Sequence, residues 1–238
     1  MQKKVEAPSR REIWKMFDQI SPTYDCANKV MTFRLDDRWR KQLCAFLPKK
    51  RGMRILDCAT GTGDQILAIL KKRPDVASII GVDLSEGMLE IGKKKITSSK
   101  VAFQVGDSLS LPFDEDSFDA VTISFGIRNV ENVSLALREM HRVLVNGGRT
   151  LILEGTLPGN RPLRALHLFY LRHILPRVGG WISKNQKAYR YLNETIETFP
   201  QQEEFCTLMR AAGFVNVKAS PLLGGVATVY QGDKNAMG

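Results

Sequence analysis

The sequence predicts an α/β fold: a doubly wound, mostly parallel, seven-stranded sheet with a helical cap and an antiparallel C-terminal hairpin. Two patterns predict this fold. From residue 53 onward, short apolar runs alternate with segments whose apolar residues recur at helical spacing. Near the end of the chain, two further runs are joined by a link containing Pro and Gly, which is typical of a hairpin. Because strands that alternate with helices pair in parallel through right-handed crossovers, helices are expected on both faces of the sheet.

The elements follow one another in a regular order. Five parallel strands are expected, at residues 53–58, 78–83, 101–107, 118–125 and 147–155. Helices are predicted over 63–73, 85–95 and 132–144, and the last of these ends before a Gly-Gly pair. A further helix around 201–213 precedes the hairpin strands at 214–220 and 225–232, and the final strand is expected to run antiparallel to the others.

This order divides the chain into four parts. Residues 1–52, with helices expected around 10–20 and 35–47, form an N-terminal helical cap, and residues 53–159 form a nucleotide-binding core. Residues 160–199 are predicted to be a basic, amphipathic cap insertion, and residues 200–238 to supply the C-terminal helix and hairpin. Sheets of this kind bind ligands at the carboxyl ends of their strands, so we expect the two cap segments to cover that edge.

Composition excludes several classes of protein. With 238 residues, of which 43% are hydrophobic, the chain has enough apolar material for a folded core and too much for a disordered protein. Its four cysteines form no CxxC pair and its three histidines no HExxH motif, so neither a metal site nor a disulfide framework is predicted. No apolar segment resembles a secretory signal or is long enough to span a bilayer, and a cytoplasmic location is expected.

The net charge of +10 is concentrated in two segments. Residues 1–55 contain 14 Lys or Arg against six Asp or Glu, and residues 160–192 contain seven against none. In the second segment arginines are interleaved with apolar residues, as in helices that lie at a membrane surface. We expect reversible contact with an anionic membrane, although a core helix with a basic outer face or a homodimer contact fits the same pattern. The residues concerned are Leu163, Leu166, Phe169, Tyr170, Ile174 and Trp181, with Arg161, Arg164, Arg172 and Arg177.

The residues that leave the first expected strand read D-C-A-T-G-T-G-D, from Asp57 to Asp64. Gly61 and Gly63 allow a tight turn and a close approach of the backbone to a ligand, and the amides of the next helix face the same space. A dinucleotide site would require a third glycine where this chain has Ile66, and the P-loop signature is absent. The loop therefore suits a nucleoside and disfavours NAD.

The following strands end in polar residues suited to a nucleoside. Asp83 can accept hydrogen bonds from both hydroxyls of a ribose. Asp107 and Ser108 end the next strand, where a side-chain acceptor can receive an adenine amino group, and Ser124 ends the strand after it. Each of these residues alone would be an ordinary cap or loop residue. Their succession along neighbouring strand ends predicts a nucleoside site.

Together, D-C-A-T-G-T-G-D, V-D-L-S, G-D-S-L-S-L-P-F and the C-terminal hairpin resemble the class I methyltransferases that use S-adenosylmethionine. The stretch I-S-F-G-I-R-N-V at 123–130 and Y-R-Y-L at 189–192, followed by F-P at 199–200, narrow the resemblance. They are similar to the ubiquinone/menaquinone biosynthesis C-methyltransferases, most of all to the demethylmenaquinone type, with Y-D at 24–25 and Asn28 as supporting matches. The similarity runs from about residue 10 to 232.

The resemblance implies methylation of a ring carbon of a prenylated quinol, either demethylmenaquinol or the benzoquinol of ubiquinone synthesis. It also implies S-adenosylmethionine as the cofactor. Asp107 departs from the Asn expected in some members, which weakens the expected adenine contact. The residues assigned to cofactor binding are Asp57, Gly61, Thr62, Gly63, Asp83, Asp107, Ser108 and Ser124.

A quinol carbon becomes nucleophilic when the adjacent hydroxyl loses its proton. Arg128 is the first candidate to stabilise the resulting phenolate, because it is a permanent cation and therefore a poor base. A water held by Arg128 and Asn129 is the expected proton acceptor. Tyr24 and Asp25 in the N-terminal cap are expected to order the substrate or relay the proton. The alternative for Arg128 is a salt bridge at a loop.

Four other functions share parts of this pattern. A small-molecule O-methyltransferase would use the same cofactor site. A nucleic-acid methyltransferase would suit the positive charge, but the chain has no [DN]PP[YF] motif and no Pro-Cys pair, so no nucleic-acid partner is predicted. A nicotinamide-dependent reductase or a non-catalytic nucleotide-binding module is disfavoured by the missing third glycine and the lack of a recognisable Tyr/Lys acid pair.

Overall fold

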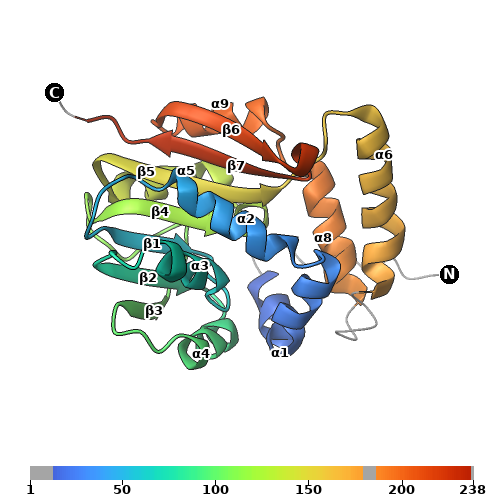
Figure 1. The fold of residues 1–238 in the computed structure, drawn as a ribbon, viewed down its shortest axis with the longest axis horizontal. Helices are drawn as coiled ribbons and strands as arrows, with labels where there is room; N and C mark the ends of the chain where they lie inside the picture. Colours follow the sequence, from blue (N-terminus) through green and yellow to red (C-terminus); the bar gives the residue numbers. More distant parts are fainter. Residues whose placement is uncertain (1–12, 179–185, 237–238) are drawn as a thin grey trace.

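The computed structural model describes residues 13–178 and 186–236 and confirms the predicted fold class (Figure 1). Seven strands form one sheet in the order β3-β2-β1-β4-β5-β7-β6. Strands β1 to β5 are parallel, whereas β7 pairs antiparallel with both β5 and β6, so the final strand is the antiparallel one, as predicted. The strands are β1 (Arg54–Cys58), β2 (Ser78–Asp83), β3 (Val101–Val105), β4 (Phe118–Ser124), β5 (Leu144–Gly155), β6 (Val215–Leu222) and β7 (Ala227–Asp233).

Helices cover both faces of the sheet. On one face, α5 (Val133–Val143) and α9 (Glu203–Ala211) contribute to a core that also contains side chains of β4, a strand buried along its whole length. On the other face, α2 (Leu35–Leu43) and α3 (Asp64–Lys72) pack against β1. Helix α4 (Glu86–Lys95) follows β2. The apolar runs that predicted β1 and β4 are thus covered on both faces, whereas the edge strand β3 is largely exposed.

A third core lies in the cap, at the carboxyl ends of the parallel strands. Figure 1 shows α1 (Ile13–Met31), α6 (Arg161–Phe169) and α8 (Gln186–Thr198) gathered at this end of the sheet. Their buried side chains belong to one cluster, which also includes Leu171 of the π-helical turn η4 (Tyr170–Ile174). Residues of both predicted cap segments contribute to it, whereas α2 packs on a face of the sheet. Trp181 of the predicted amphipathic segment lies outside the described residues.

The first helix is longer than expected. The sequence predicted a helix around residues 10–20, but α1 continues to Met31 through Pro22. Apolar side chains on both sides of the proline, including Ile20 and Ala27, are buried in the cap. Tertiary packing therefore outweighs the local cost of proline inside a helix. The helix expected over 35–47 ends at Leu43 and is followed by the 3-10 turn η2 (Cys44–Phe46).

Two strand boundaries also differ from the expected ones. The strand expected over 101–107 ends at Val105, and Asp107 forms only an isolated bridge with Ser110. Strand β5 begins at Leu144 instead of residue 147, and its pairing with β4 shifts register near the Gly-Gly pair. Asp107 therefore projects from a loop beyond the sheet.

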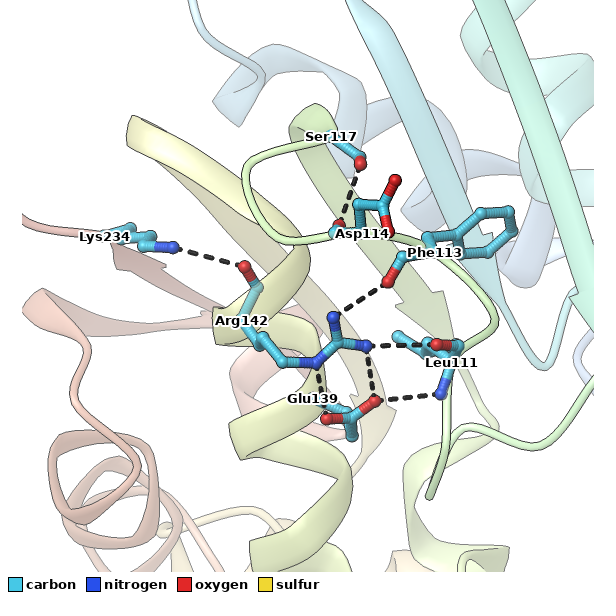
Figure 2. Close-up of polar contacts among 7 residues, drawn as sticks. All are labelled: Leu111, Phe113, Asp114, Ser117, Glu139, Arg142 and Lys234. Atoms are coloured by element: carbon cyan, nitrogen blue, oxygen red, sulfur yellow. Dashed lines mark hydrogen bonds and ion pairs between the residues drawn. The ribbon is translucent and has the colours of Figure 1, made fainter.

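Polar contacts fix the loop between β3 and β4 to helix α5 (Figure 2). Arg142 donates hydrogen bonds to the carbonyls of Phe113, at 2.8 Å, and Leu111, at 3.0 Å, and pairs with Glu139. Glu139 in turn accepts a bond of 2.9 Å from the amide of Leu111. Lys234, which follows β7, donates to the carbonyl of Arg142. These contacts therefore hold against α5 the loop that begins beside the predicted nucleoside site.

Candidate active site

A cavity of about 340 Å³ opens at the carboxyl ends of β1, β2, β3 and β4. This volume is typical of a small-molecule site, for which roughly 300–1,000 Å³ is usual. Five of the predicted cofactor residues line it: Gly61, Asp83, Asp107, Ser108 and Ser124. Helix α1 contributes Ile13, Trp14, Phe17 and Tyr24 to the same cavity.

Asp83 presents an oriented carboxylate to this cavity. Its Oδ2 accepts a hydrogen bond of 2.8 Å from the amide of Gly61, and its Oδ1 accepts one of 2.9 Å from the amide of Ser85. Gly61 has a φ of +55°, which glycine adopts without strain. Burial raises the pKa of Asp83, and the amide bonds act in the opposite direction. Because each oxygen keeps a second lone pair, the carboxylate can still receive two adjacent hydroxyls.

The two neighbouring strand ends are also held in fixed conformations. Oδ1 of Asp107 accepts a 2.9 Å bond from the amide of Leu109. Ser124 donates a 2.9 Å bond to Oε1 of Gln65 in α3. The structure therefore brings these side chains together along one cavity, which Asp107 reaches from a loop.

The remaining three predicted cofactor residues occupy other positions. Asp57 is 1% exposed and accepts bonds from Thr60 at 2.6 Å and Thr122 at 2.5 Å, so its carboxylate supports the turn from within the protein. Burial raises the pKa of Asp57 to about 6, against the effect of these two hydroxyls. Asp57 and Thr62 line a small adjoining pocket. Gly63 faces Ile96, whose Cδ1 would lie 2.8 Å from an added Cβ.

Thr62 and Asp25 meet in a polar cluster that joins the cap to the glycine loop. The Thr62 hydroxyl donates to Asp25 at 2.6 Å. Lys95 of α4 donates to Asp25 at 2.7 Å, to Asp64 at 2.8 Å and to Thr62 at 2.9 Å. Asp25, which the sequence assigned to ordering the substrate or relaying a proton, is engaged in this cluster and lines neither the cavity beside Asp83 nor the one under the cap.

A second contact anchors α1 over the first cavity. Oδ1 of Asp18 accepts bonds from the hydroxyl of Ser85, at 2.6 Å, and from the amide of Gly87, at 2.9 Å, at the start of α4. Helix α1 is thereby tied to the sheet beside Asp83, and its apolar side chains close the cavity.

A second cavity, of about 260 Å³, lies under the cap. Apolar side chains from several helices form much of its wall, among them Met31, Trp39, Leu171 and Ile196. Tyr24 and Phe125 line both cavities and so mark their junction. Burial raises the pKa of Tyr24, so its hydroxyl is protonated at neutral pH.

Arg128 and Asn129 lie in the 3-10 turn η3 (Ile127–Asn129) but line different cavities. Arg128 lines the second cavity and forms an ion pair with Glu154, which is completely buried in β5. The salt bridge that the sequence left open therefore exists. Asn129 lines the first cavity, and its buried Oδ1 has no hydrogen-bond partner in the described part of the chain. An unpartnered buried amide oxygen is typical of a position that meets a ligand.

Two buried charged residues of the second cavity were not identified from the sequence. Asp36 and Arg40 lie one turn apart on α2 and are 2% and 7% exposed. Both line the second cavity. Their spacing is visible in the segment L-D-D-R-W-R-K, but charges fall on every side of this helix. The sequence alone therefore gave no sign of which of them would be buried.

The chain matches the family model described as the ubiE/COQ5 methyltransferase family over residues 4–234. It is 44% identical over 227 residues to the ubiquinone/menaquinone biosynthesis C-methyltransferase UbiE of Geotalea uraniireducens (strain Rf4), covering 94% of this chain and 96% of that protein. It is 39% identical over 234 residues to the demethylmenaquinone methyltransferase of Porphyromonas gingivalis, covering 97% and 96% of the two chains.

Solved structures share the fold at lower identity. A putative S-adenosyl-L-methionine-dependent methyltransferase of Methanococcus maripaludis matches with a TM-score of 0.62 and 21% identity, covering 100% of this chain and 99% of that one. The [4+2]-cyclase SpnF matches with a TM-score of 0.65 and 16% identity, covering 97% and 98%. These likenesses show the fold alone, because function depends on the residues of the site.

Proposed function

This chain belongs to the ubiE/COQ5 methyltransferase family, and we propose that it transfers a methyl group from S-adenosylmethionine to a ring carbon of a prenylated quinol in menaquinone or ubiquinone synthesis. The observation that carries this proposal is a pair of cavities that share Tyr24 and Phe125. The first offers polar groups suited to an adenosyl moiety, and the second offers a largely apolar space suited to a ring and the start of a prenyl tail.

The residues of the first cavity fit S-adenosylmethionine by their chemistry. Asp83 has free lone pairs for the ribose hydroxyls, and Asp107 and Ser108 offer polar contacts for the adenine. The unpartnered Oδ1 of Asn129 can accept a bond from an ammonium or amino group of the ligand. When bound, the cofactor supplies a methyl group attached to a cationic sulfur. This sulfur is a good leaving group because it departs as a neutral thioether.

The protein's own contribution is to position the ring and exclude water. Tyr24 is a hydrogen-bond donor at neutral pH because burial raises its pKa, so it orients a ring oxygen. Nε of Arg128 has no partner in residues 13–178 or 186–236 and can donate to the same ring, although Glu154 neutralises the charge of the guanidinium. Both side chains line the second cavity, where the acceptor ring would lie.

One reaction tests the proposed function. The protein is incubated with labelled S-adenosylmethionine and a short-tailed demethylmenaquinol under reducing conditions, and the ring is analysed by mass spectrometry. We expect one added methyl group on a ring carbon. The oxidised quinone is the matched control and should be inert, because it has no hydroxyl to deprotonate.

Other outcomes would replace the proposal. A methyl group on oxygen would indicate an O-methyltransferase. Methyl incorporation into RNA or DNA, with salt-sensitive binding, would indicate a nucleic-acid methyltransferase. Tight binding of NADH without binding of S-adenosylmethionine would point to a reductase.

The second cavity also suggests where the substrate enters. Phe33 and Leu223 line it, yet they expose 75% and 59% of their surfaces. On α6, Phe169 is 55% exposed, and Arg161 and Arg164 are exposed on the same helix. Exposed apolar residues beside arginines support contact with an anionic membrane that holds the prenylated substrate. Within the described ranges, no helix is both long and apolar enough to cross a bilayer.

Vesicle sedimentation tests the membrane contact. We expect the protein to sediment with anionic vesicles and less with neutral ones. Arg161→Glu combined with Arg164→Glu should abolish the difference, whereas Lys71→Glu with Lys72→Glu, which removes the same charge from α3, should preserve it. Unchanged sedimentation of the first variant would refute the contact, and a change in its oligomeric state by light scattering would assign the surface to a dimer.

A further inference from the structure

Two charged residues of α2 are buried at the second cavity with incomplete sets of partners. Oδ1 of Asp36 accepts a 2.6 Å bond from the hydroxyl of Thr32, but Oδ2 has no partner in the described part of the chain. Nε of Arg40 is likewise buried without a partner there, and its guanidinium carbon lies 5.2 Å from the centroid of the Phe125 ring. Burying a charged group is unfavourable unless an opposite charge or hydrogen bonds compensate it. Such groups are therefore candidates for contact with a ligand.

Arg40 differs from Arg128 in the availability of its charge. Arg128 is paired with the buried carboxylate of Glu154. Among residues 13–178 and 186–236, no carboxylate lies within ion-pair distance of Arg40, and no cation within ion-pair distance of Asp36. The cavity thus contains a guanidinium without a carboxylate at ion-pair distance and a carboxylate with a free oxygen, one turn apart on one helix. The charge of Arg40 also acts at longer range on Asp57 and Asp64, which line the small adjoining pocket with it.

We propose that Asp36 and Arg40 are catalytic residues that receive the reacting hydroxyl of the ring, Asp36 as the proton acceptor and Arg40 as the cation that stabilises the oxyanion. This inference rests on the proposed quinol methylation. It concerns how the chain activates the acceptor, which the cofactor cavity does not explain.

The proposed step removes a proton from the ring hydroxyl and forms a bond between the ring carbon and the methyl carbon. The O–H bond of the ring hydroxyl breaks, and its proton passes to Oδ2 of Asp36. An oxygen electron pair moves into the ring, and the adjacent carbon bonds to the methyl carbon as the methyl–sulfur bond breaks, with the electron pair remaining on sulfur. The ring carbon then loses its hydrogen to water as a proton, and the oxygen regains a proton from Asp36. One proton is released overall.

The other ionisable residues that line this cavity are Tyr24, Arg128, His167 and Tyr170. Burial raises the pKa of each tyrosine and lowers that of His167, so at neutral pH the tyrosines are protonated and the imidazole is neutral. His167 is therefore the competing proton acceptor. Within the described ranges, Asp36 is the only carboxylate among the residues that line this cavity.

A binding experiment tests the inference without turnover. A naphthol whose absorbance changes on ionisation is bound to the full chain with S-adenosylhomocysteine present, and the pKa of the bound naphthol is measured. Arg40→Met should raise this pKa by about one unit, a tenfold loss of affinity for the anion. Asp36→Asn should lower it, because a neighbouring negative charge is removed.

Matched controls lie on the same helix. Asp37→Asn and Arg38→Gln remove the same charges from residues that do not line the cavity, and should leave the pKa of the bound naphthol unchanged. The methyl ether of the naphthol, which cannot ionise, should bind all variants equally. Arg40→Lys keeps the charge and should give a smaller shift than Arg40→Met, which provides a second measurement if Arg40→Met fails to fold.

Turnover supplies the second readout. Asp36→Asn should lower kcat for quinol methylation by roughly 100-fold or more, the usual range for loss of a general base. The loss should diminish as rising pH ionises the quinol in solution. Equal kcat values for Asp36→Asn and the unmodified protein at all pH values would overturn the assignment. A loss of kcat of about 100-fold in His167→Gln without one in Asp36→Asn would overturn it as well.

Two further outcomes separate the hypotheses. If Arg40→Met weakens S-adenosylhomocysteine binding tenfold but leaves the naphthol unshifted, Arg40 serves the cofactor and the inference is wrong. If the naphthol shifts appear but no quinol is methylated, the proposed function fails instead. If the unmodified protein methylates the quinol but neither Arg40→Met nor Asp36→Asn shifts the pKa of the bound naphthol, the inference is wrong and the proposed function stands.

Discussion

The two cavities are of similar size but are built in different ways. The first takes its polar groups from the ends of adjacent strands, so that Gly61, Asp83 and Ser124 meet because the sheet places them side by side. The second takes its walls from helices that are distant in the sequence. There, the hydroxyl of Tyr170 donates to the carbonyl of Met31, 139 residues away. The binding of the cofactor thus depends on local turns on a sheet, whereas acceptor binding depends on how the cap packs.

The buried charges show the same difference. Asp83 is held by two backbone amides from the loops around it. The charged residues of the second cavity come from α2 and η3, and within the described ranges only Arg128 among them forms an ion pair. Substitutions should therefore affect the two cavities independently, apart from those at their junction.

The largest expected effect tests the ion pair between Arg128 and Glu154. Glu154→Gln should lower the free energy of unfolding by about 3–5 kcal/mol, because it leaves a buried guanidinium without its counter-charge. The double variant Arg128→Met with Glu154→Gln should recover most of that loss. Denaturant unfolding measures both. A single variant as stable as the unmodified protein would mean that Arg128 is free to serve the substrate as a full charge.

The next effect concerns the buried carboxyl group of Asp57, which lines the small pocket adjoining the first cavity. The pKa of Asp57 is raised to about 6 in the folded protein, so the folded state holds this proton at pH values where the unfolded state has lost it. The free energy of unfolding should therefore fall by up to about 3 kcal/mol as the pH rises from about 4 to 6. Unfolding curves across this range should show the fall in the unmodified protein and less of it in Asp57→Asn. Identical pH dependence in both would contradict the assignment.

Asp83→Asn should weaken ligand binding in the first cavity and leave ligand binding in the second cavity nearly unchanged. Loss of charge-assisted bonds to two hydroxyls should weaken S-adenosylhomocysteine binding about 100-fold. Naphthol binding in the second cavity should change little. Calorimetry on both ligands measures this, with Asp114→Asn on the exposed loop after β3 as the control. Equal losses for both ligands would show that the cavities are coupled.

The smallest effect tests the wall beside the junction. In Gly126→Ala the added Cβ would lie 2.7 Å from Cβ of Ala59, so we expect a loss of roughly 1–2 kcal/mol in the free energy of unfolding. Gly159→Ala, where nothing lies within 4 Å of an added Cβ, should be nearly neutral. Thermal unfolding compares the two variants. If both behave alike, the packing beside Gly126 is looser than the structure shows.

The sequence by itself determined the sheet, the antiparallel last strand and the line of polar residues at its edge. It could do so because burial on both faces requires apolar runs, and because parallel strands bring their carboxyl ends together. Only the tertiary structure decided that α1 runs on through Pro22, that Arg128 meets Glu154, and that Asp36 and Arg40 are buried on α2. A periodic pattern shows which side of an element is apolar, but the partner of a charged residue depends on the packing of segments far apart in the chain.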